Sequence, residues 1–590
     1  MYLLQAIVVV VFVFFIPAMA LKPKLACQPK TALAIPFVSV AVVLLIQSAL
    51  SVTGTFSPAA VQVITLILAI TAATRLWITN RVPGQQTGWS AYSTQVLLIA
   101  LALCIYFSPM LLVYGFDKDD EIYSWNMWAI QYFLGEPIDF SYTRAPYPQL
   151  FPKILSYSYM LLGGIEFQTA TKTALIVFPF IVFSALGLAP ARNRYIYLAI
   201  YIFLSLFLLR EVDLKHRFDD GMPDTMMAVG VLLSVFYFLQ FSKDSTRVDY
   251  LWLSVICSAV AALTKQPALV WSVASMPLLL AYAYIRKEMR FTHLLIGTIP
   301  AIVGIIWILT EGRDFHDNAG VTGRSFAERG YIDQLVFSFK LYFVSDWKLS
   351  ALYILGTISC IVNRRMLGVL LLFTLPSTIT WLLFANYDIR AGLPAILTMP
   401  LFLAYSGYIF GHNSKSEEDV KFRLAVLAVL SIFLTIFALS DALSSIEKHR
   451  KKKDPGFELG HPLRNNFVRM FPHDADKIYK EIVLDEDSRI WAPTHYVYGL
   501  FYGYTNVTRP AHSNRLYSAE ELLQELRSTR RNFVTNSGEV PAGPGGMVLD
   551  KLVNETCPSL FQIFSGPGND KDVTIYKLDS ELLHSNYCEP

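Results

Sequence analysis

The sequence predicts a polytopic α-helical membrane protein of about 14 helices, with a small α/β domain at its C-terminus. Three observations support this fold class. The 590 residues are 54% hydrophobic and only 16% charged, with a mean hydropathy of +0.43. Apolar runs of roughly 20 residues recur, which is the length needed to cross a bilayer core. After about residue 442 these runs stop, and short strand-like segments alternate with polar turns.

The predicted membrane helices form one domain over residues 1–441. The first of them could be a signal peptide, but it has no basic residues before it, so we expect a retained helix. The predicted spans are 2–20, 31–52, 57–76, 93–114, 168–189, 195–210, 225–242, 250–264, 267–285, 291–310, 348–362, 366–385, 391–410 and 423–441.

Basic residues fall on alternate short loops of this arrangement, which predicts that these loops face the cytoplasm. The opposite face then holds the longer loops 115–167, 211–224, 311–347 and 386–390, together with everything after about 442. The net charge of +3 gives no indication of a nucleic-acid partner. The basic loop residues are Lys22, Lys24, Lys30, Arg75, Arg81, Arg192, Arg194, Lys243, Arg247, Arg286, Lys287, Arg290, Arg364, Arg365, Lys415, Lys421 and Arg423.

Residues 442–590 are predicted to form a small α/β domain. Strands are expected at 488–492, 531–535 and 572–576, and an amphipathic helix over 518–526 begins with a capping signal at Ser518. The proline- and glycine-rich stretch 541–546 predicts a loop. Cys557 and Cys588 are the only cysteines of this region, and they could pair if it faces an oxidising compartment.

The clearest motif is an acidic cluster directly after the apolar run that ends near Tyr114. Charge so close to hydrocarbon is unfavourable, which indicates a functional site. Adjacent carboxylates suit general base catalysis, the binding of sugar hydroxyls, or a divalent cation such as Mg²⁺, Mn²⁺ or Ca²⁺. The structural alternative is an acidic turn that faces headgroups and caps the next helix. The acids are Asp117, Asp119, Asp120 and Glu121, of which the last three would be the metal ligands.

The rest of this first outer loop predicts two helices that lie in the membrane plane. Pro146, Pro148 and Pro152 forbid a regular helix and predict an extended chain. The apolar, aromatic segments 122–134 and 154–164 on either side are too short to span a bilayer, so we interpret them as interfacial helices.

A second acidic loop, 211–224, lies on the same predicted face. Asp224 stands at the start of the next helix, where an aspartate is most often an N-cap. The mixture of acids and bases before it suits a phosphate together with a metal or a sugar. The residues concerned are His216, Arg217, Asp219 and Asp220.

Lys265 and Arg390 occupy outer turns where the positive-inside rule disfavours cations. They could extend to the lipid headgroups, or they could bind the phosphate of a lipid substrate. The chain contains neither a Gly-x-x-x-x-Gly-Lys-Ser/Thr motif nor a dinucleotide fingerprint, so an activated substrate should reach this face already linked to lipid.

This pattern resembles the GT-C glycosyltransferases, which combine many membrane helices, an acidic motif in the first outer loop, two interfacial helices and an outer C-terminal domain. The layout matches over nearly the whole chain, and sequence similarity to the mannosyl- and aminoarabinosyl-transferase branch is confined to short patches. These are Asp119-Asp120-Glu121, Ala261 with Leu263-Thr264-Lys265-Gln266, Tyr387-Asp388-Ile389-Arg390 with Leu393-Pro394 and, more loosely, Asp224.

The resemblance implies a polyprenyl-phosphate-linked sugar donor and inverting transfer to an acceptor hydroxyl. The acceptor would be an extracytoplasmic protein such as pilin, lipid A or another surface glycan. The implied membrane is a bacterial inner membrane with the C-terminal domain in the periplasm. Asp119 or Asp120 would act as base, with Asp117 beside them. The implied phosphate binders are Lys265, Arg390, Arg144, His216 and Arg217.

Three other functions remain open from the sequence. A transporter or flippase would place ionisable residues near the bilayer midplane and break its helices. A polysaccharide ligase or polymerase with a diphosphate-linked donor would rely on basic outer loops. A receptor or scaffold would use the C-terminal region as a binding module.

Overall fold

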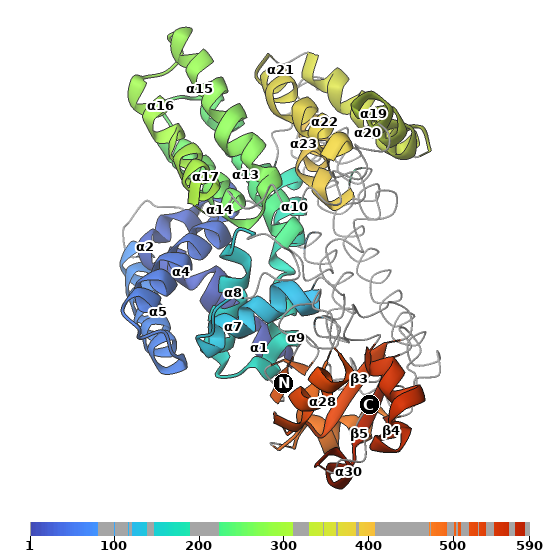
Figure 1. The fold of residues 1–590 in the computed structure, drawn as a ribbon. Coiled ribbons are helices and arrows are strands. Elements are labelled where there is room, and N and C mark those ends of the chain that lie inside the picture. Colours follow the sequence, from blue (N-terminus) through green and yellow to red (C-terminus); the bar gives the residue numbers. More distant parts are fainter. Residues whose placement is uncertain are drawn as a thin grey trace, which may run out of the picture.

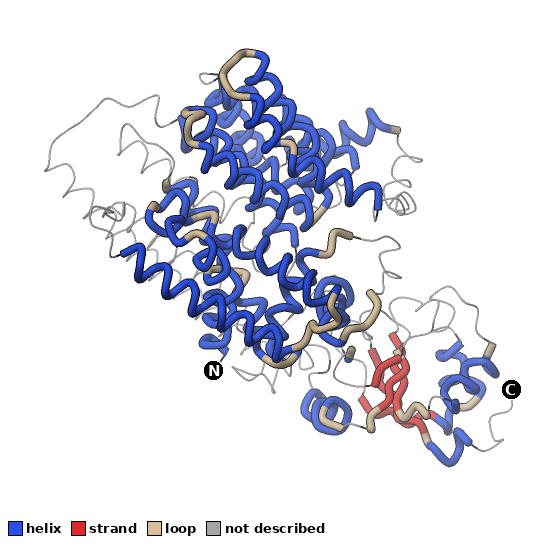
Figure 2. The backbone as a smooth tube through the Cα atoms, turned by 90° about the vertical axis from the view of Figure 1, so that its left-hand side faces the viewer, coloured by secondary structure: helices blue, strands red, loops and turns tan. Residues whose placement is uncertain are grey.

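The described part of the chain is a helical body with a small β-sheet unit at one end (Figure 1; Figure 2). The computed structural model describes residues 2–80, 100, 116, 121–138, 147–188, 204, 223–310, 330–345, 347–361, 364–384, 389–406, 471, 474–485, 487–492, 501–502, 506–508, 518–528, 530–537, 548–565 and 573–584.

Eight helical segments within these residues are long and apolar enough to cross a membrane, which indicates a membrane protein. Three shorter apolar helices also match predicted spans. Predicted spans 93–114, 195–210 and 423–441 lie outside the described residues, apart from 100 and 204, so the total of about 14 stays a prediction. The eight are Leu3–Leu21, Pro29–Val52, Pro58–Thr79, Ile165–Gly187, Pro223–Lys243, Gln266–Ile285, Phe291–Thr310 and Arg365–Phe384.

The N-terminal helices pack with those of the predicted first outer loop, 115–167, and with the helix that follows it. Val9 and Phe14 of the first helix are buried in the core, where the helix contacts α4 and α9. The elements are α1 (Tyr2–Phe14), α2 (Ile16–Leu21), η1 (Pro23–Cys27), α3 (Pro29–Ala32), α4 (Ile35–Val52), α5 (Pro58–Asn80), η2 (Glu121–Asn126), α7 (Met127–Leu134), α8 (Leu150–Leu162), η3 (Ile165–Phe167), α9 (Gln168–Ala174) and α10 (Val177–Gly187).

The two predicted interfacial segments are helices, but the second begins earlier than expected. α8 starts at Leu150 and includes Pro152, so the prediction that this proline excludes a helix was wrong. Proline is tolerated in a first turn because the amide hydrogen it lacks would have no partner there. Gly135 and Gly163 follow α7 and α8 with left-handed backbones and end them. α8 is buried on most sides, and its position relative to a membrane stays a prediction.

A tightly packed hairpin of α13 and α14 forms the centre of the body. A Cβ at Gly230 would lie 2.9 Å from both Ala261 Cβ and a ring carbon of Phe37, so only glycine permits this approach. Ser234 and Ser254 exchange hydrogen bonds across the hairpin. The elements here are α13 (Pro223–Lys243), α14 (Val248–Thr264), η4 (Gln266–Ala268), η5 (Val270–Ser275), α15 (Met276–Ile285), α16 (Phe291–Gly297) and α17 (Ile299–Thr310).

A further group of helices packs against α13 through α23. Its first helix falls in the stretch 311–347, which the sequence analysis treats as a loop, so that prediction was wrong for residues 331–344. The elements are α19 (Tyr331–Phe339), η7 (Lys340–Val344), α20 (Trp347–Ile361), α21 (Arg364–Val369), η8 (Leu370–Thr374), α22 (Leu375–Phe384), η9 (Ile389–Gly392) and α23 (Leu393–Ser406).

The C-terminal unit is a five-stranded mixed sheet with the order β2-β1-β3-β5-β4. The strands predicted at β1, β3 and β5 and the helix α28 are confirmed, whereas β2 and β4 were missed. β1 pairs in parallel with β2 and β3, and β5 is antiparallel to β3 and β4. The elements are α26 (Ala475–Ile478), η10 (Tyr479–Val483), β1 (Arg489–Trp491), β2 (Asn506–Thr508), α28 (Ala519–Ser528), β3 (Phe533–Ser537), η11 (Leu552–Thr556), η12 (Pro558–Leu560), β4 (Phe561–Ser565), β5 (Val573–Leu578) and α30 (Ser580–His584).

The two faces of this sheet belong to different cores. Trp491 and Val534 pack with the leucines of α28, and Cys557 is buried in that same cluster. Ile490 and Phe533, one residue earlier on each strand, join a cluster that continues through α26 into the helical body. This alternation follows from the two-residue period of a strand. Cys588 lies outside the described residues, so its pairing with Cys557 stays open.

Candidate functional site

Four of the predicted site residues lie in the described part of the chain: Glu121, Asp224, Lys265 and Arg390. The others fall outside it, so their roles stay predictions. They are Asp117, Asp119, Asp120, Arg144, His216, Arg217, Asp219 and Asp220.

Asp224 and Lys265 form an ion pair at one end of the α13–α14 hairpin. Lys265 Nζ lies 2.8 Å from both carboxylate oxygens of Asp224. The lysine side chain is 21% exposed and the aspartate side chain 2%. Asp224 is the second residue of α13 rather than its N-cap, and its negative charge there is favoured by the helix dipole.

The local sequence explains why Lys265 turns towards α13. Its backbone is extended and ends α14, and Gln266 and Pro267 then form a short 3-10 turn. The ring of Pro267 prevents α14 from continuing regularly through this point. Lys265 therefore contacts another helix, which disfavours the interpretation that it extends to headgroups.

Trp125 connects this pair to the first outer loop. The Lys265 ammonium lies 5.9 Å from the centre of the Trp125 ring, within the range of a cation–π contact. Trp125 also packs edge-on against Trp128, Tyr147 and Phe151. Residues 125, 224 and 265, which are far apart in the sequence, thus meet in the fold. Trp125 itself follows the acidic cluster by only a few residues.

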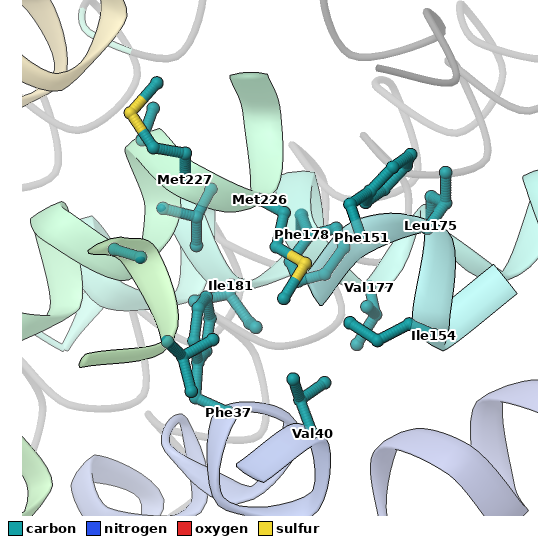
Figure 3. Packing of buried hydrophobic residues seen from close by; sticks show 14 of the residues in the cluster. Phe37, Val40, Phe151, Ile154, Leu175, Val177, Phe178, Ile181, Met226 and Met227 are labelled. Atoms are coloured by element: carbon teal, nitrogen blue, oxygen red, sulfur yellow. The ribbon is translucent and has the colours of Figure 1, made fainter. Parts of the chain in front are cut away.

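Apolar side chains fill the space close to Asp224. Met226, two residues further along α13, lies among apolar residues of α4, α8 and α10, including Phe37, Phe151 and Phe178 (Figure 3). Such surroundings lower the local dielectric constant, which strengthens the attraction between Asp224 and Lys265.

Glu121, the last acid of the cluster, forms a second ion pair. Its Oε2 accepts a hydrogen bond from Lys172 Nζ at 3.0 Å, and both side chains are almost completely buried. The Lys172 ammonium also lies 5.8 Å from the centre of the Phe116 ring. Phe116 is the residue directly before the acidic cluster. Lys172 of α9 thereby holds both flanks of residues 117–120.

Sequence reasoning missed Lys172, although a signal was available. The residue stands within predicted span 168–189, and a cation inside a membrane helix is by itself an indication of function.

Arg390 and two buried glutamine side chains complete the description of this region. Arg390 lies in η9, which packs against α13, the helix that carries Asp224. Gln266 Nε2 and Gln149 Oε1 are buried and have no hydrogen-bond partner among the described residues. A buried amide atom without a partner is unfavourable, so each of these atoms requires a partner beyond the described residues.

Of the three predicted metal ligands, only Glu121 lies in the described part of the chain, where Lys172 pairs with its carboxylate. Asp119 and Asp120 lie outside it, so the divalent-cation hypothesis stays a prediction.

The C-terminal unit contacts the predicted first outer loop directly. The Tyr502 hydroxyl donates a hydrogen bond to Glu136, just after the end of α7. The sheet unit accordingly lies at the α7 end of the helical body in Figure 1.

We found no family model, curated protein or solved structure that matches this chain.

Proposed function

We propose that this protein is a membrane glycosyltransferase of the GT-C type, which moves a sugar from a polyprenyl-phosphate-linked donor to an acceptor hydroxyl. The observation that supports this most is the meeting of Trp125, Asp224 and Lys265. This contact places the Lys265 cation against the loop that carries the acidic cluster. The proposed reaction needs both a carboxylate base and a cation.

The chemistry assigns separate tasks to the acids and the cation. Asp119 or Asp120 removes the proton of the acceptor hydroxyl, whose oxygen forms a bond to the anomeric carbon while the carbon–oxygen bond to the lipid phosphate breaks. The configuration inverts, and negative charge develops on the departing phosphate. Lys265 stabilises that charge, which lowers the barrier.

The geometry of Lys265 suits this task. An ammonium has three N–H donors, and two of them serve the oxygens of Asp224. The third remains for a phosphate oxygen, on a side chain that is still partly exposed. Asp224 acts as a positioning residue because it fixes the lysine before the donor arrives.

Transfer measured in cells that lack the gene and receive variants from a plasmid tests the proposal. Asp119→Asn and Asp120→Asn should not both restore the sugar on surface glycoconjugates and glycoproteins, as detected by mass spectrometry. Loss of a general base lowers the rate by roughly 10²–10⁴-fold. Lys287→Gln, an exposed cation far from the pair in sequence, is the matched control. Wild-type transfer by both aspartate variants would refute the catalytic assignment.

A second candidate is a transporter. Buried Lys172 favours it, because this lysine lies inside the candidate span Ile165–Gly187 and pairs with Glu121. Sidedness of the acidic cluster helps to separate the two functions. With Lys118→Cys, an impermeant thiol reagent should label the transferase from outside. Labelling only from the cytoplasm would exclude transfer at the outer face.

A further inference from the structure

Basic side chains from several segments gather at the end of the α13–α14 hairpin opposite to Asp224 and Lys265. α13 has 21 residues, so Lys243 at its end lies roughly 30 Å from Asp224 at its start. Arg247 precedes α14, and Lys30 belongs to the helical segment Pro29–Val52.

Two tyrosines connect Lys30 to Arg247. The Tyr237 hydroxyl donates to the Lys30 carbonyl oxygen at 2.6 Å. Tyr237 stacks on Tyr250 with ring centres 6.1 Å apart, and the Arg247 guanidinium lies 4.7 Å from the centre of the Tyr250 ring. Lys243 and Arg247 are close enough for their charges to repel the Lys30 ammonium.

The nearby carboxylates of Asp244 and Asp249 do not form an ion pair with the Lys30 ammonium. Asp249 is held by Arg247 at 2.9 Å, and Asp244 accepts hydrogen bonds from Thr246. Within the described ranges the half-buried Lys30 ammonium has no ion-pair partner. A partly desolvated cation without an ion-pair partner is unfavourable unless an anion completes the site.

The position of the cluster indicates where the anion comes from. Lys30 is the second residue of a candidate membrane span, which is the depth of the headgroups. Trp77 and Trp252 are exposed near the ends of α5 and α14 at this side, and exposed tryptophans typically mark the membrane interface. Arg75 Nη1 donates to the Leu21 carbonyl at 2.8 Å, which adds a cation beside Lys22.

We propose that Lys30, Lys243 and Arg247 form a binding site for the phosphate of an anionic phospholipid. This goes beyond the transferase proposal, because the lipid is neither donor nor acceptor and sits at the other end of the helices. Basic pockets between membrane helices are a recognised place for such headgroups.

The full-length protein in phosphatidylcholine nanodiscs, with or without phosphatidylglycerol, tests the site. Native mass spectrometry should show phosphatidylglycerol retained by the wild type and by Lys30→Arg. Lys30→Gln should bind it roughly fivefold more weakly, as expected for one lysine at a membrane surface. Arg286→Gln, an exposed cation at the predicted same face, should bind like the wild type.

The following results would contradict the proposal. Equal retention by Lys30→Gln would remove Lys30 from the site, and equal loss in Arg286→Gln would mean unspecific attraction to a basic face. Displacement of the lipid by inorganic phosphate would show a site for soluble anions. If Lys30→Gln does not fold, the wild type must still unfold at a higher temperature with phosphatidylglycerol than without it, and Lys243→Gln must reduce that shift.

Discussion

The ammonium of Lys265 lies 2.8 Å from both carboxylate oxygens of Asp224, although 41 positions separate the two residues. The pair closes one end of the α13–α14 hairpin, and Trp125 brings the first outer loop against it. The same contact can stabilise the fold and hold a cation ready for a phosphate, and mutation can separate these two contributions.

Loss of one partner should destabilise the protein more than loss of both. Lys265→Met leaves a buried carboxylate without compensation, and we expect a loss of about 3 kcal/mol in the free energy of unfolding. The double variant Lys265→Met with Asp224→Leu should recover much of it, because no charge then remains buried. Unfolding by denaturant in detergent measures the wild type, both single variants and the double variant, and additive losses would show that the pair is not coupled.

The Glu121–Lys172 ion pair should fix the position of the acidic cluster, residues 117–120. Lys172→Met removes the cation that lies 3.0 Å from the Glu121 carboxylate and should cost about 3–5 kcal/mol, because both side chains are buried. Glu121→Gln with Lys172→Met should regain stability.

Sugar transfer by the stable double variant then separates two roles of this pair. If the pair positions residues 117–120, transfer should remain low even though the fold is restored. Full transfer by the double variant would reduce the pair to a structural role.

The hydrogen bond between Tyr502 and Glu136 should hold the C-terminal unit against α7. Tyr502→Phe removes only the hydroxyl, and we expect a loss of about 1–2 kcal/mol at this contact because the acceptor is charged. Limited proteolysis of the full chain should then release the C-terminal unit faster than in the wild type. Tyr331→Phe, on an exposed tyrosine of α19, is the control. Unchanged cleavage in Tyr502→Phe would show that other contacts dominate.

Close approach of α13 and α14 should depend on Gly230. A Cβ there would lie 2.9 Å from Ala261 Cβ, so Gly230→Ala should destabilise the protein by about 1–3 kcal/mol, and Gly230→Val by more. Addition of Ala261→Gly should recover part of the loss in Gly230→Ala. Thermal unfolding in detergent checks this order, and a neutral Gly230→Val would contradict the packing.

Features that depend on local sequence could be predicted. The helix α28 begins where expected because Ser518 Oγ accepts from the Glu521 amide while the Glu521 carboxylate accepts from the Ser518 amide. β4 escaped prediction because its register shifts between Ile563 and Ser565, which interrupts the alternation of buried and exposed residues. The start of α8 was missed because Pro152 was taken as a helix breaker.

By itself, the sequence determined the described apolar helices, three of the five described C-terminal strands, helix α28 and the residue types that a phosphate site would use, because hydrophobic periodicity, capping and turn chemistry act over a few neighbouring residues. Only the tertiary structure decided that Lys265 pairs with Asp224, that Lys172 holds Glu121, and that Lys30 meets Arg247 through two tyrosines. These pairings join helices distant in the chain. They depend on how side chains pack between those helices, and no local pattern encodes that packing.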